Sequence, residues 1–281
     1  MPRIVDTSEI IPVVAKLCQK ACYELSENLV AALETAYRKE ESPYSKDALE
    51  LLIKNAEYAK GEQMACCHDT GVAIVVIHIG QEVSWSGIPL DEAVNAGVAK
   101  GYKEGYLRFS MVIDPLERVN TGDNTPCVMH TEIIPGDQVH ITVMPKGGGS
   151  ENMGAFSVLV PAAGEEGVKD FVIQTVEKAG GKACPPIVVG VGVGGTMDHC
   201  AWLAKKALLR PIGSRNAKAS YAKMEDELIN RINDLGIGTL GMGGRVTALD
   251  VHIEYYPCHI TSLPVAVNLQ CHAGRYASAT I

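Results

Sequence analysis

The stretch Met64-Ala-Cys-Cys-His-Asp-Thr-Gly71, followed at once by Val72-Ala-Ile-Val-Val-Ile-His-Ile79, organises the rest of the chain. The second part is apolar over almost its whole length and predicts a buried strand. The first part places a thiol, an imidazole and a carboxylate on three consecutive residues, Cys67, His68 and Asp69. Because a stiff strand would hold this polar turn in place, we expect reactive groups here.

Helical and strand-like patterns alternate outward from this stretch, which predicts a mixed α/β fold with a helical N-terminal segment. The segment 120–126 is dense in turn-forming residues and predicts a structured loop. We expect helices over residues 8–40, with a break near Ser26, and a further helix that starts at an N-cap, Ser45. Later helices are expected over 89–104, 165–179, 196–209 and 216–235. Strands are expected over 72–79, 130–144, 187–195, 248–256 and 264–269.

The overall composition is that of a globular protein with a sizeable core. The chain has 281 residues, of which 47% are hydrophobic and 21% charged, and its formal net charge is −8 at pH 7. It contains no long basic block, so we expect neither nucleic acid nor an anionic membrane as its main partner. Neither a secretory signal nor a long apolar run is present, and we expect a cytoplasmic protein.

Nine cysteines are many for a cytoplasmic chain, and none of them forms a C-x-x-C pair. The odd count and the missing pairs argue against a disulfide framework, a zinc ribbon or a thioredoxin-type redox site. We expect most of these thiols to be small buried apolar groups, including the i, i+4 pair Cys18 and Cys22.

Two glycine-rich segments match ligand-binding motifs only in part. Gly190-x-Gly192-x-x-Gly195 lacks the acidic residue about 20 positions later that holds a dinucleotide ribose, because no Asp or Glu occurs between His199 and Lys223. We interpret these glycines as a close contact between strand and helix, or between backbone and a neighbouring site. Lys146-Gly-Gly-Gly-Ser150 has its lysine before the glycines, unlike a phosphate loop, and predicts a ligand-facing loop or a tight turn.

Three cysteines differ from the others in context, because each lies in a turn beside a predicted strand. They are Cys67, Cys184 in Gly180-Gly-Lys-Ala-Cys-Pro-Pro186, and Cys271 in Asn268-Leu-Gln-Cys-His-Ala-Gly-Arg275. Thiolates from distant parts of a chain can hold an iron–sulfur cluster, and three of them would leave one iron open to a substrate. Their spacing alone does not separate such a site from three unrelated thiols.

The residues around these cysteines add a resemblance. Cys67-His-Asp-Thr-Gly71 is similar to the Cys-Gln-Asp-Thr-Gly motif of iron–sulfur-dependent (class I) fumarate hydratases and the related tartrate dehydratases. Further segments match the same family in the same order, from about residue 10 to the end. They are Arg118-x-Asn-Thr-Gly-Asp-Asn-Thr-Pro126, Lys146-Gly-Gly-Gly-Ser-Glu-Asn152, Ala183-Cys-Pro-Pro-Ile-Val-Val-Gly-Val-Gly192, Ala207-Leu-Leu-Arg-Pro-Ile-Gly213 and Ile260-Thr-Ser-Leu-Pro-Val-Ala-Val-Asn268.

The resemblance implies the α subunit of an enzyme that other members of the family build as one long chain. It implies a β subunit that completes the active site with substrate arginines, a lysine and a threonine base. We expect a hetero-oligomer, for which two α and two β subunits are one arrangement. Residues 1–281 are then a single domain, with a helical segment over 1–60 and an α/β core over 61–281 around a cluster-binding cleft.

The resemblance also implies roles for particular residues. Cys67, Cys184 and Cys271 would hold a [4Fe-4S] cluster whose fourth iron binds the substrate. Asp69 would be the catalytic residue of this chain, beside the open iron and hydrogen-bonded to the base from the partner. Adjacent side chains on extended backbone point apart, so only one of Cys66 and Cys67 should face the cluster. The resemblance to the family motif selects Cys67, and we expect Cys66 to pack in the core.

Four further residues are expected to bind the substrate. Arg108 matches an arginine that pairs with a carboxylate, a task that suits a planar guanidinium. His259 matches a histidine that contacts the substrate, and Gly149 or a neighbour would present a backbone N–H. His68 stands where the family has glutamine, and histidine titrates near neutral pH, so we expect an altered specificity or pH optimum.

The reaction implied is the reversible addition of water to a small dicarboxylate, and we expect fumarate and L-malate as the substrates. The alternative is an L-tartrate dehydratase α subunit, which converts tartrate to oxaloacetate. A more distant alternative is a non-catalytic or electron-transfer protein that holds a cluster.

Overall fold

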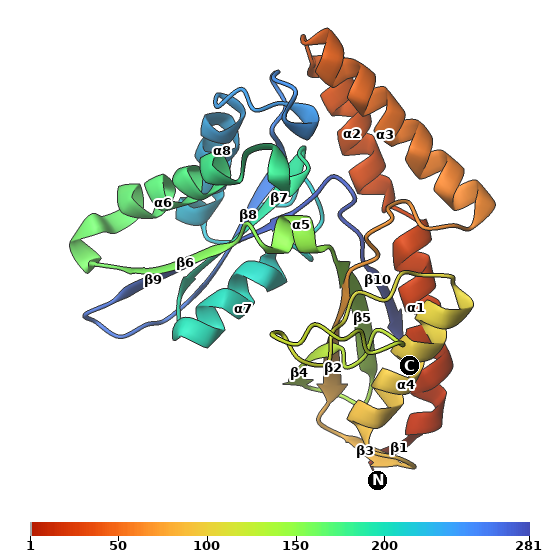
Figure 1. Cartoon of the computed structure of the whole chain (residues 1–281). Coiled ribbons are helices and arrows are strands. Elements are labelled where there is room, and N and C mark those ends of the chain that lie inside the picture. The colour runs from red at the N-terminus through yellow and green to blue at the C-terminus, as the bar shows by residue number, and fades with distance from the viewer. Residues whose placement is uncertain (1) are drawn as a thin grey trace. The chain divides into compact units, whose positions relative to one another are not determined.

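The computed structural model describes residues 2–281 and divides the chain into two compact units, each with its own sheet (Figure 1). Unit 1 contains the described residues up to Ser26, then Ala56–Gly148 and Arg275–Ile281; unit 2 contains Glu27–Asn55 and Gly149–Gly274. Helices and strands alternate after an N-terminal helix, which confirms the mixed α/β fold. No helix within residues 2–281 is long and apolar enough to cross a membrane.

The sheet of unit 1 is built around β2 (Val72–Gly80), the apolar strand that the sequence predicts. Its order is β10-β5-β2-β4, and β2 pairs in parallel with β4 and antiparallel with β5. The neighbouring strands are β4 (Val128–Ile134), β5 (Val139–Lys146) and β10 (Ala277–Thr280).

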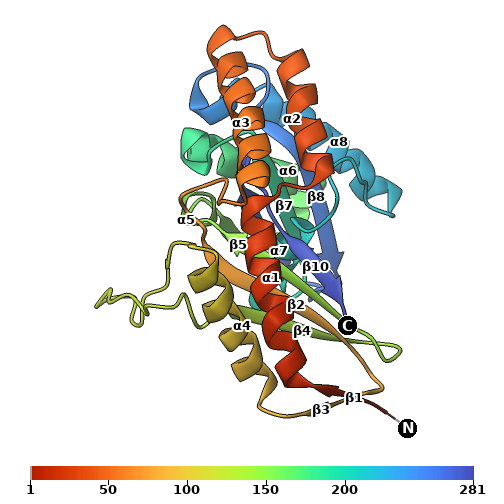
Figure 2. The same cartoon turned by 90° about the vertical axis from the view of Figure 1, so that its right-hand side faces the viewer.

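Two helices, α1 (Ile10–Tyr23) and α4 (Leu90–Glu104), cover one face of this sheet (Figure 2). They pack closely because α4 has glycine at the contact; a Cβ at Gly101 would lie 2.7 Å from the carbonyl oxygen of Ala15. Cys18 and Cys22 are fully buried in this core, as expected. A separate pair of short parallel strands, β1 (Arg3–Asp6) and β3 (Val83–Ser86), also belongs to unit 1 and was not predicted.

Two sequence-based expectations about local structure are wrong. The strand expected over 130–144 is two strands, β4 and β5, because Pro135 and Gly136 (φ +98°) break it with a turn. Ser45 does not cap a helix: α3 (Pro43–Glu62) begins two residues earlier, and the Ser45 hydroxyl donates to the carbonyl oxygen of Gly243 at 2.6 Å.

The sheet of unit 2 has the order β6-β9-β7-β8 and is covered on both faces. Helices α6 (Gly164–Ala179) and α8 (Ala219–Asn233) pack on one face, and α7 (Met197–Ala207) packs on the other. The strands are β6 (Ala155–Leu159), β7 (Ile187–Gly194), β8 (Ala248–Tyr256) and β9 (Leu263–Gln270), and the unit also includes α2 (Glu27–Lys39), the first part of α3 and most of the short α5 (Gly148–Glu151).

Strand β7 explains the incomplete dinucleotide motif. Val189, Val191 and Val193 face the core beneath α6 and α8, whereas Gly190 and Gly192 face α7. A Cβ at Gly190 would lie 2.1 Å from the carbonyl oxygen of Ala204, and one at Gly192 would lie 2.1 Å from that of Cys200. The glycines therefore allow a helix to lie directly on a strand, which confirms the packing interpretation.

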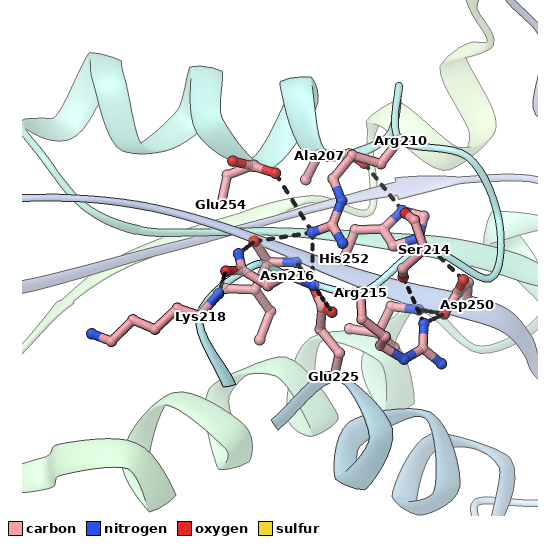
Figure 3. A network of polar contacts seen from close by, with 12 residues as sticks. Ala207, Arg210, Ser214, Arg215, Asn216, Lys218, Glu225, Asp250, His252 and Glu254 are labelled. Atoms are coloured by element: carbon pink, nitrogen blue, oxygen red, sulfur yellow. Dashed lines mark hydrogen bonds and ion pairs between the residues drawn. The ribbon is translucent and has the colours of Figure 1, made fainter. Parts of the chain in front are cut away.

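A buried polar network fixes the connection between α7 and α8 to strand β8 (Figure 3). The Asp250 carboxylate accepts from the Gly213 N–H at 2.6 Å and from the Arg215 guanidinium at 2.8 Å. His252 is fully buried; its Nε2 lies 3.1 Å from the Asp250 carboxylate and its Nδ1 lies 3.2 Å from the Ala207 carbonyl oxygen. Burial alone would raise the pKa of Asp250, but the hydrogen bonds from His252 and Gly213 and the charge of Arg215 lower it below its usual value.

Glu225 on α8 provides the second centre of this network. Its fully buried carboxylate accepts from the Arg210 guanidinium at 2.7 Å, from the Asn216 N–H at 2.8 Å and from the Ile253 N–H at 2.8 Å. A buried charge is tolerated only when it is paired and hydrogen-bonded in this way. The segment Ala207–Gly213, which matches the family resemblance, therefore helps to hold unit 2 together.

Gly192→Ala should destabilise unit 2, because its Cβ would overlap backbone atoms of α7. We expect the free energy of unfolding to fall by about 1–3 kcal/mol, the usual cost of overpacking. Urea unfolding, followed by the fluorescence of Trp202 on α7, would measure this. Gly61→Ala is the control, since a Cβ there meets nothing within 4 Å and the helix should gain stability. Equal stability of the two variants would contradict this packing.

Asp250→Asn should lower the free energy of unfolding at pH 7 by about 1–3 kcal/mol, because buried donors lose a charged acceptor. Since the folded-state pKa of Asp250 is lowered, its contribution is present above the unfolded pKa of about 4 and is lost as the pH falls below that value. Unfolding curves of wild type and variant should therefore converge in acid. A difference that persists unchanged at low pH would exclude the ionised carboxylate as its source.

Candidate functional site

The polar turn that precedes β2 is fixed from several sides within unit 1. Thr70 is buried, and its hydroxyl donates to the carbonyl oxygen of Arg108 at 2.9 Å. The hydroxyl of Tyr102, on α4, donates to the Thr70 carbonyl oxygen at 2.8 Å. Gly71 has φ +73°, and a Cβ there would lie 2.5–2.8 Å from backbone atoms of Lys146. Only glycine fits this position.

Asp69 links this turn to the glycine segment after β5. One carboxylate oxygen accepts from the Gly71 N–H at 3.0 Å, and the other accepts from the Gly148 N–H at 2.8 Å. The Asp69 backbone carbonyl accepts from the guanidinium of Arg275. Backbone donors therefore orient the carboxylate, and its remaining lone pairs are left for other partners.

Arg108 and His68 lie at the same end of unit 1, and both residues are exposed. The loop that follows Arg108 is tied to the turn by Asn124, which is fully buried. The Asn124 side chain accepts from the Ser110 N–H at 2.6 Å and donates to the Gly71 carbonyl oxygen at 3.2 Å. The expected structured loop over 120–126 is confirmed, because the described backbone there has side-chain-bonded turns and no helix.

Cys184 and Cys271 come together in unit 2. Cys184 has φ +55°, and its carbonyl oxygen accepts from the backbone N–H of His272 at 3.2 Å and lies 3.0 Å from the His272 Nδ1. A carbonyl oxygen can only accept, so the Nδ1 of His272 bears a proton. The residue that follows Cys271 is thus fastened to Cys184 by two hydrogen bonds.

Gly149 and His259 also belong to unit 2, and both are exposed. The Cβ position of Gly149 is 3.4 Å from the carbonyl oxygen of Lys182, which places Gly149 beside the segment before Cys184. His259 lies in the turn between β8 and β9. Its Nδ1 accepts from the Thr261 N–H at 3.2 Å, so a neutral His259 would have its proton on Nε2.

Burial separates the candidate ligand cysteines from most of the others. Cys67, Cys184 and Cys271 are half-buried thiols, as is Cys127; Cys18, Cys22, Cys66 and Cys200 are buried and Cys258 is exposed. Burial raises the pKa of Cys22 to about 12 and those of Cys127 and Cys200 to about 11, so these thiols stay protonated near neutral pH. A thiolate is what binds metal. Cys22, Cys127 and Cys200 are therefore poorly suited to hold a cluster.

The candidate ligands are divided between the units, with Cys67 in unit 1 and Cys184 and Cys271 in unit 2. Within neither unit, as far as its described residues go, do three His, Cys, Asp or Glu side chains group as metal ligands. Three thiols in turns fit the donor set of a cluster, while the buried Cys66 lies deeper than its neighbour Cys67.

Three supporting residues were not singled out from the sequence as parts of the site. In the sequence, Tyr102 falls on the apolar face of the helix expected over 89–104. Only the fold shows that its hydroxyl donates to the turn. Asn124 lies in a segment that was interpreted as a loop and as part of the family resemblance, without a role for Asn124 itself. The sequence offered one indication for Arg275, because it lies only four residues after a candidate ligand, Cys271.

Comparisons with known proteins agree with the resemblance seen in the motifs. The sequence model of the family "Fumarate hydratase (Fumerase)" matches residues 11–280. A Methanocaldococcus jannaschii protein, provisionally named L(+)-tartrate dehydratase subunit alpha, is 46% identical over 275 residues, which cover 96% of each chain. The L(+)-tartrate dehydratase subunits alpha of Escherichia coli strain UTI89 and Shigella sonnei are each 31% identical over 272 residues, which cover 95% of this chain and 89% of theirs.

The family model matches nearly the whole chain, and the relatives align with it along almost their full lengths. The chain belongs to the fumarate hydratase (Fumerase) family of hydro-lyases, in the group of class I fumarate hydratases and L(+)-tartrate dehydratase α subunits.

Proposed function

We propose that this chain is the α subunit of an L(+)-tartrate dehydratase, which together with a β subunit converts L(+)-tartrate to oxaloacetate and water. The observation behind this choice is the near full-length similarity to proteins that bear this name, at 46% and 31% identity. The sequence-based choice of fumarate is less well supported than its tartrate alternative. Fumarate hydration stays as the second candidate because the matching family is described by that activity.

The proposed cofactor is a [4Fe-4S] cluster held by Cys67, Cys184 and Cys271. Members of this family are iron–sulfur hydro-lyases, and the three half-buried thiols suit such a group. When bound, a cluster with one open iron supplies a Lewis acid that polarises the leaving hydroxyl of the substrate. The residues around the cysteines then have to bind and orient the dicarboxylate.

Arg108 and Asp69 have the chemistry for the remaining steps on this chain. The exposed Arg108 guanidinium would pair with a substrate carboxylate through two parallel hydrogen bonds. Asp69 is held by two backbone N–H groups and would accept a hydrogen bond from the base that the β subunit provides. Loss of hydroxide from one carbon and a proton from the next gives the enol of oxaloacetate, which then tautomerises to the ketone.

His68 is the residue in this turn that differs from the glutamine of the family motif. Tartrate has a second hydroxyl where malate has only hydrogen, and the extra hydroxyl needs a hydrogen-bond partner in the site. His68 is exposed, lies between Cys67 and Asp69, and offers a donor and an acceptor in its neutral form. We propose that it binds this second hydroxyl.

The cluster assignment predicts that Cys184→Ala lowers bound iron by more than about tenfold after anaerobic reconstitution, since one of three ligands is lost. Iron and sulfide analysis and EPR spectra of the α and β chains purified together would measure this. Cys200→Ala is the matched control and should retain its iron, because Cys200 is buried beside β7. Equal iron in wild type and Cys184→Ala would remove Cys184 from the ligand set.

The substrate assignment predicts that His68→Leu, which removes both ring nitrogens, lowers kcat/KM for L(+)-tartrate by about tenfold, the value of one hydrogen bond, and changes that for fumarate less. Steady-state assays of the αβ complex on both substrates would measure the ratio. His78→Leu is the control, because His78 lies on β2 and faces Glu132. If the wild-type complex hydrates fumarate but leaves tartrate unchanged, the second candidate replaces the first.

A further inference from the structure

Two of the points where the chain passes between the units lie next to the same residue of unit 1, Asp69. The chain leaves unit 1 after Gly148 and returns to it at Arg275. The Gly148 N–H donates to the Asp69 carboxylate at 2.8 Å, and the Arg275 guanidinium donates to the Asp69 backbone carbonyl. Asp69 thus contacts the last residue before the passage into unit 2 and the first residue after the return.

Arg275 is the unusual member of this arrangement, because its side chain is almost completely buried, with 2% exposed. Its Nε also points toward the carbonyl oxygen of Pro145, at 3.5 Å. A Cβ at Gly147 would lie 3.2 Å from the Asp69 carboxylate and 3.8 Å from the Arg275 Nη2, so the missing side chain there leaves room for both groups. A buried guanidinium is retained where its fixed fork of donors organises acceptors.

The chain distances connect this contact to the cysteines. Cys67 is two residues before Asp69, and Cys271 is four residues before Arg275. Four residues of fully extended chain span at most about 14 Å. The contact between Arg275 and Asp69 is therefore close along the chain to both cysteines.

We propose that Arg275 is a positioning residue of the site. By holding the Asp69 turn and the glycines after β5 together within unit 1, it fixes the position of Cys67, which lies two residues before Asp69. The contact to the Asp69 backbone also keeps the Asp69 carboxylate on the Gly148 N–H. The link to the cysteines rests on the proposed function, whereas the link to the Gly71 and Gly148 amides does not.

The first test measures hydrogen exchange of the amides that Asp69 binds, in the cluster-free full chain. Arg275→Met keeps the length of the side chain but removes its donors, and exchange of the Gly71 and Gly148 amides should accelerate at least tenfold. Arg275→Lys keeps the charge and one donor group and should give an intermediate rate. It also provides the readout if the Met variant does not fold.

The matched control is Arg210→Met, which removes a guanidinium bonded to a buried carboxylate within unit 2. It should lower the melting temperature but leave the Gly71 and Gly148 exchange rates within threefold of wild type. Unchanged exchange in both Arg275 variants, or equal acceleration in Arg210→Met, would overturn the proposed anchor.

The second test measures iron per folded chain after reconstitution of the αβ complex. Arg275→Met should bind at least fivefold less iron than wild type, while Arg210→Met should bind as much per folded chain as wild type. Faster exchange with full iron content would show that the anchor does not position the ligands. If wild type itself binds no iron, the proposed cluster fails, and the exchange measurement alone decides the role of Arg275.

Discussion

The close approach of Gly71 to the backbone of Lys146 is the constraint on which the turn and its surroundings depend. Val72 and Lys146 are register partners of β2 and β5, so this approach occurs where the two central strands of unit 1 meet. The left-handed backbone of Gly71 turns the preceding residues toward the glycines after β5. The register of β2 and β5, the placement of the glycines and the orientation of Asp69 therefore depend on one another. A side chain at position 71 would disturb all three.

The sequence predicts the elements with strong internal patterns and fails where only tertiary contacts decide. The apolar run of β2 and the helix that ends at Gly105 were found, since hydrophobic periodicity and end signals agree there. The turn at Pro135–Gly136 was missed because the alternation continues across it. Strand β10 is too short to be recognised without β5 beside it, and Ser45 looks like a cap until its acceptor, Gly243, is known.

The candidate site was predictable as a set of motifs, and its support was not. Cys67 and Asp69 stand out because a thiol and a carboxylate precede a core strand. Nothing in the chain near Tyr102 or Asn124 shows that their polar groups reach the turn, since these contacts join residues that are 32 and 53 positions apart. The incomplete glycine motif of β7 was correctly read as packing, because the acidic residue that the ligand requires is missing.

Unit 1 is built from separate segments of the chain, and this has a consequence for synthesis of the protein on the ribosome. Strand β10 completes its sheet at the edge of β5, yet the whole of the second segment of unit 2 is translated between β5 and β10. During that interval the edge of β5 has unpaired backbone groups that another strand could join. Most of the core of unit 1 thus precedes the second segment of unit 2 in the chain, but its sheet gains the edge strand β10 only after unit 2 has been translated.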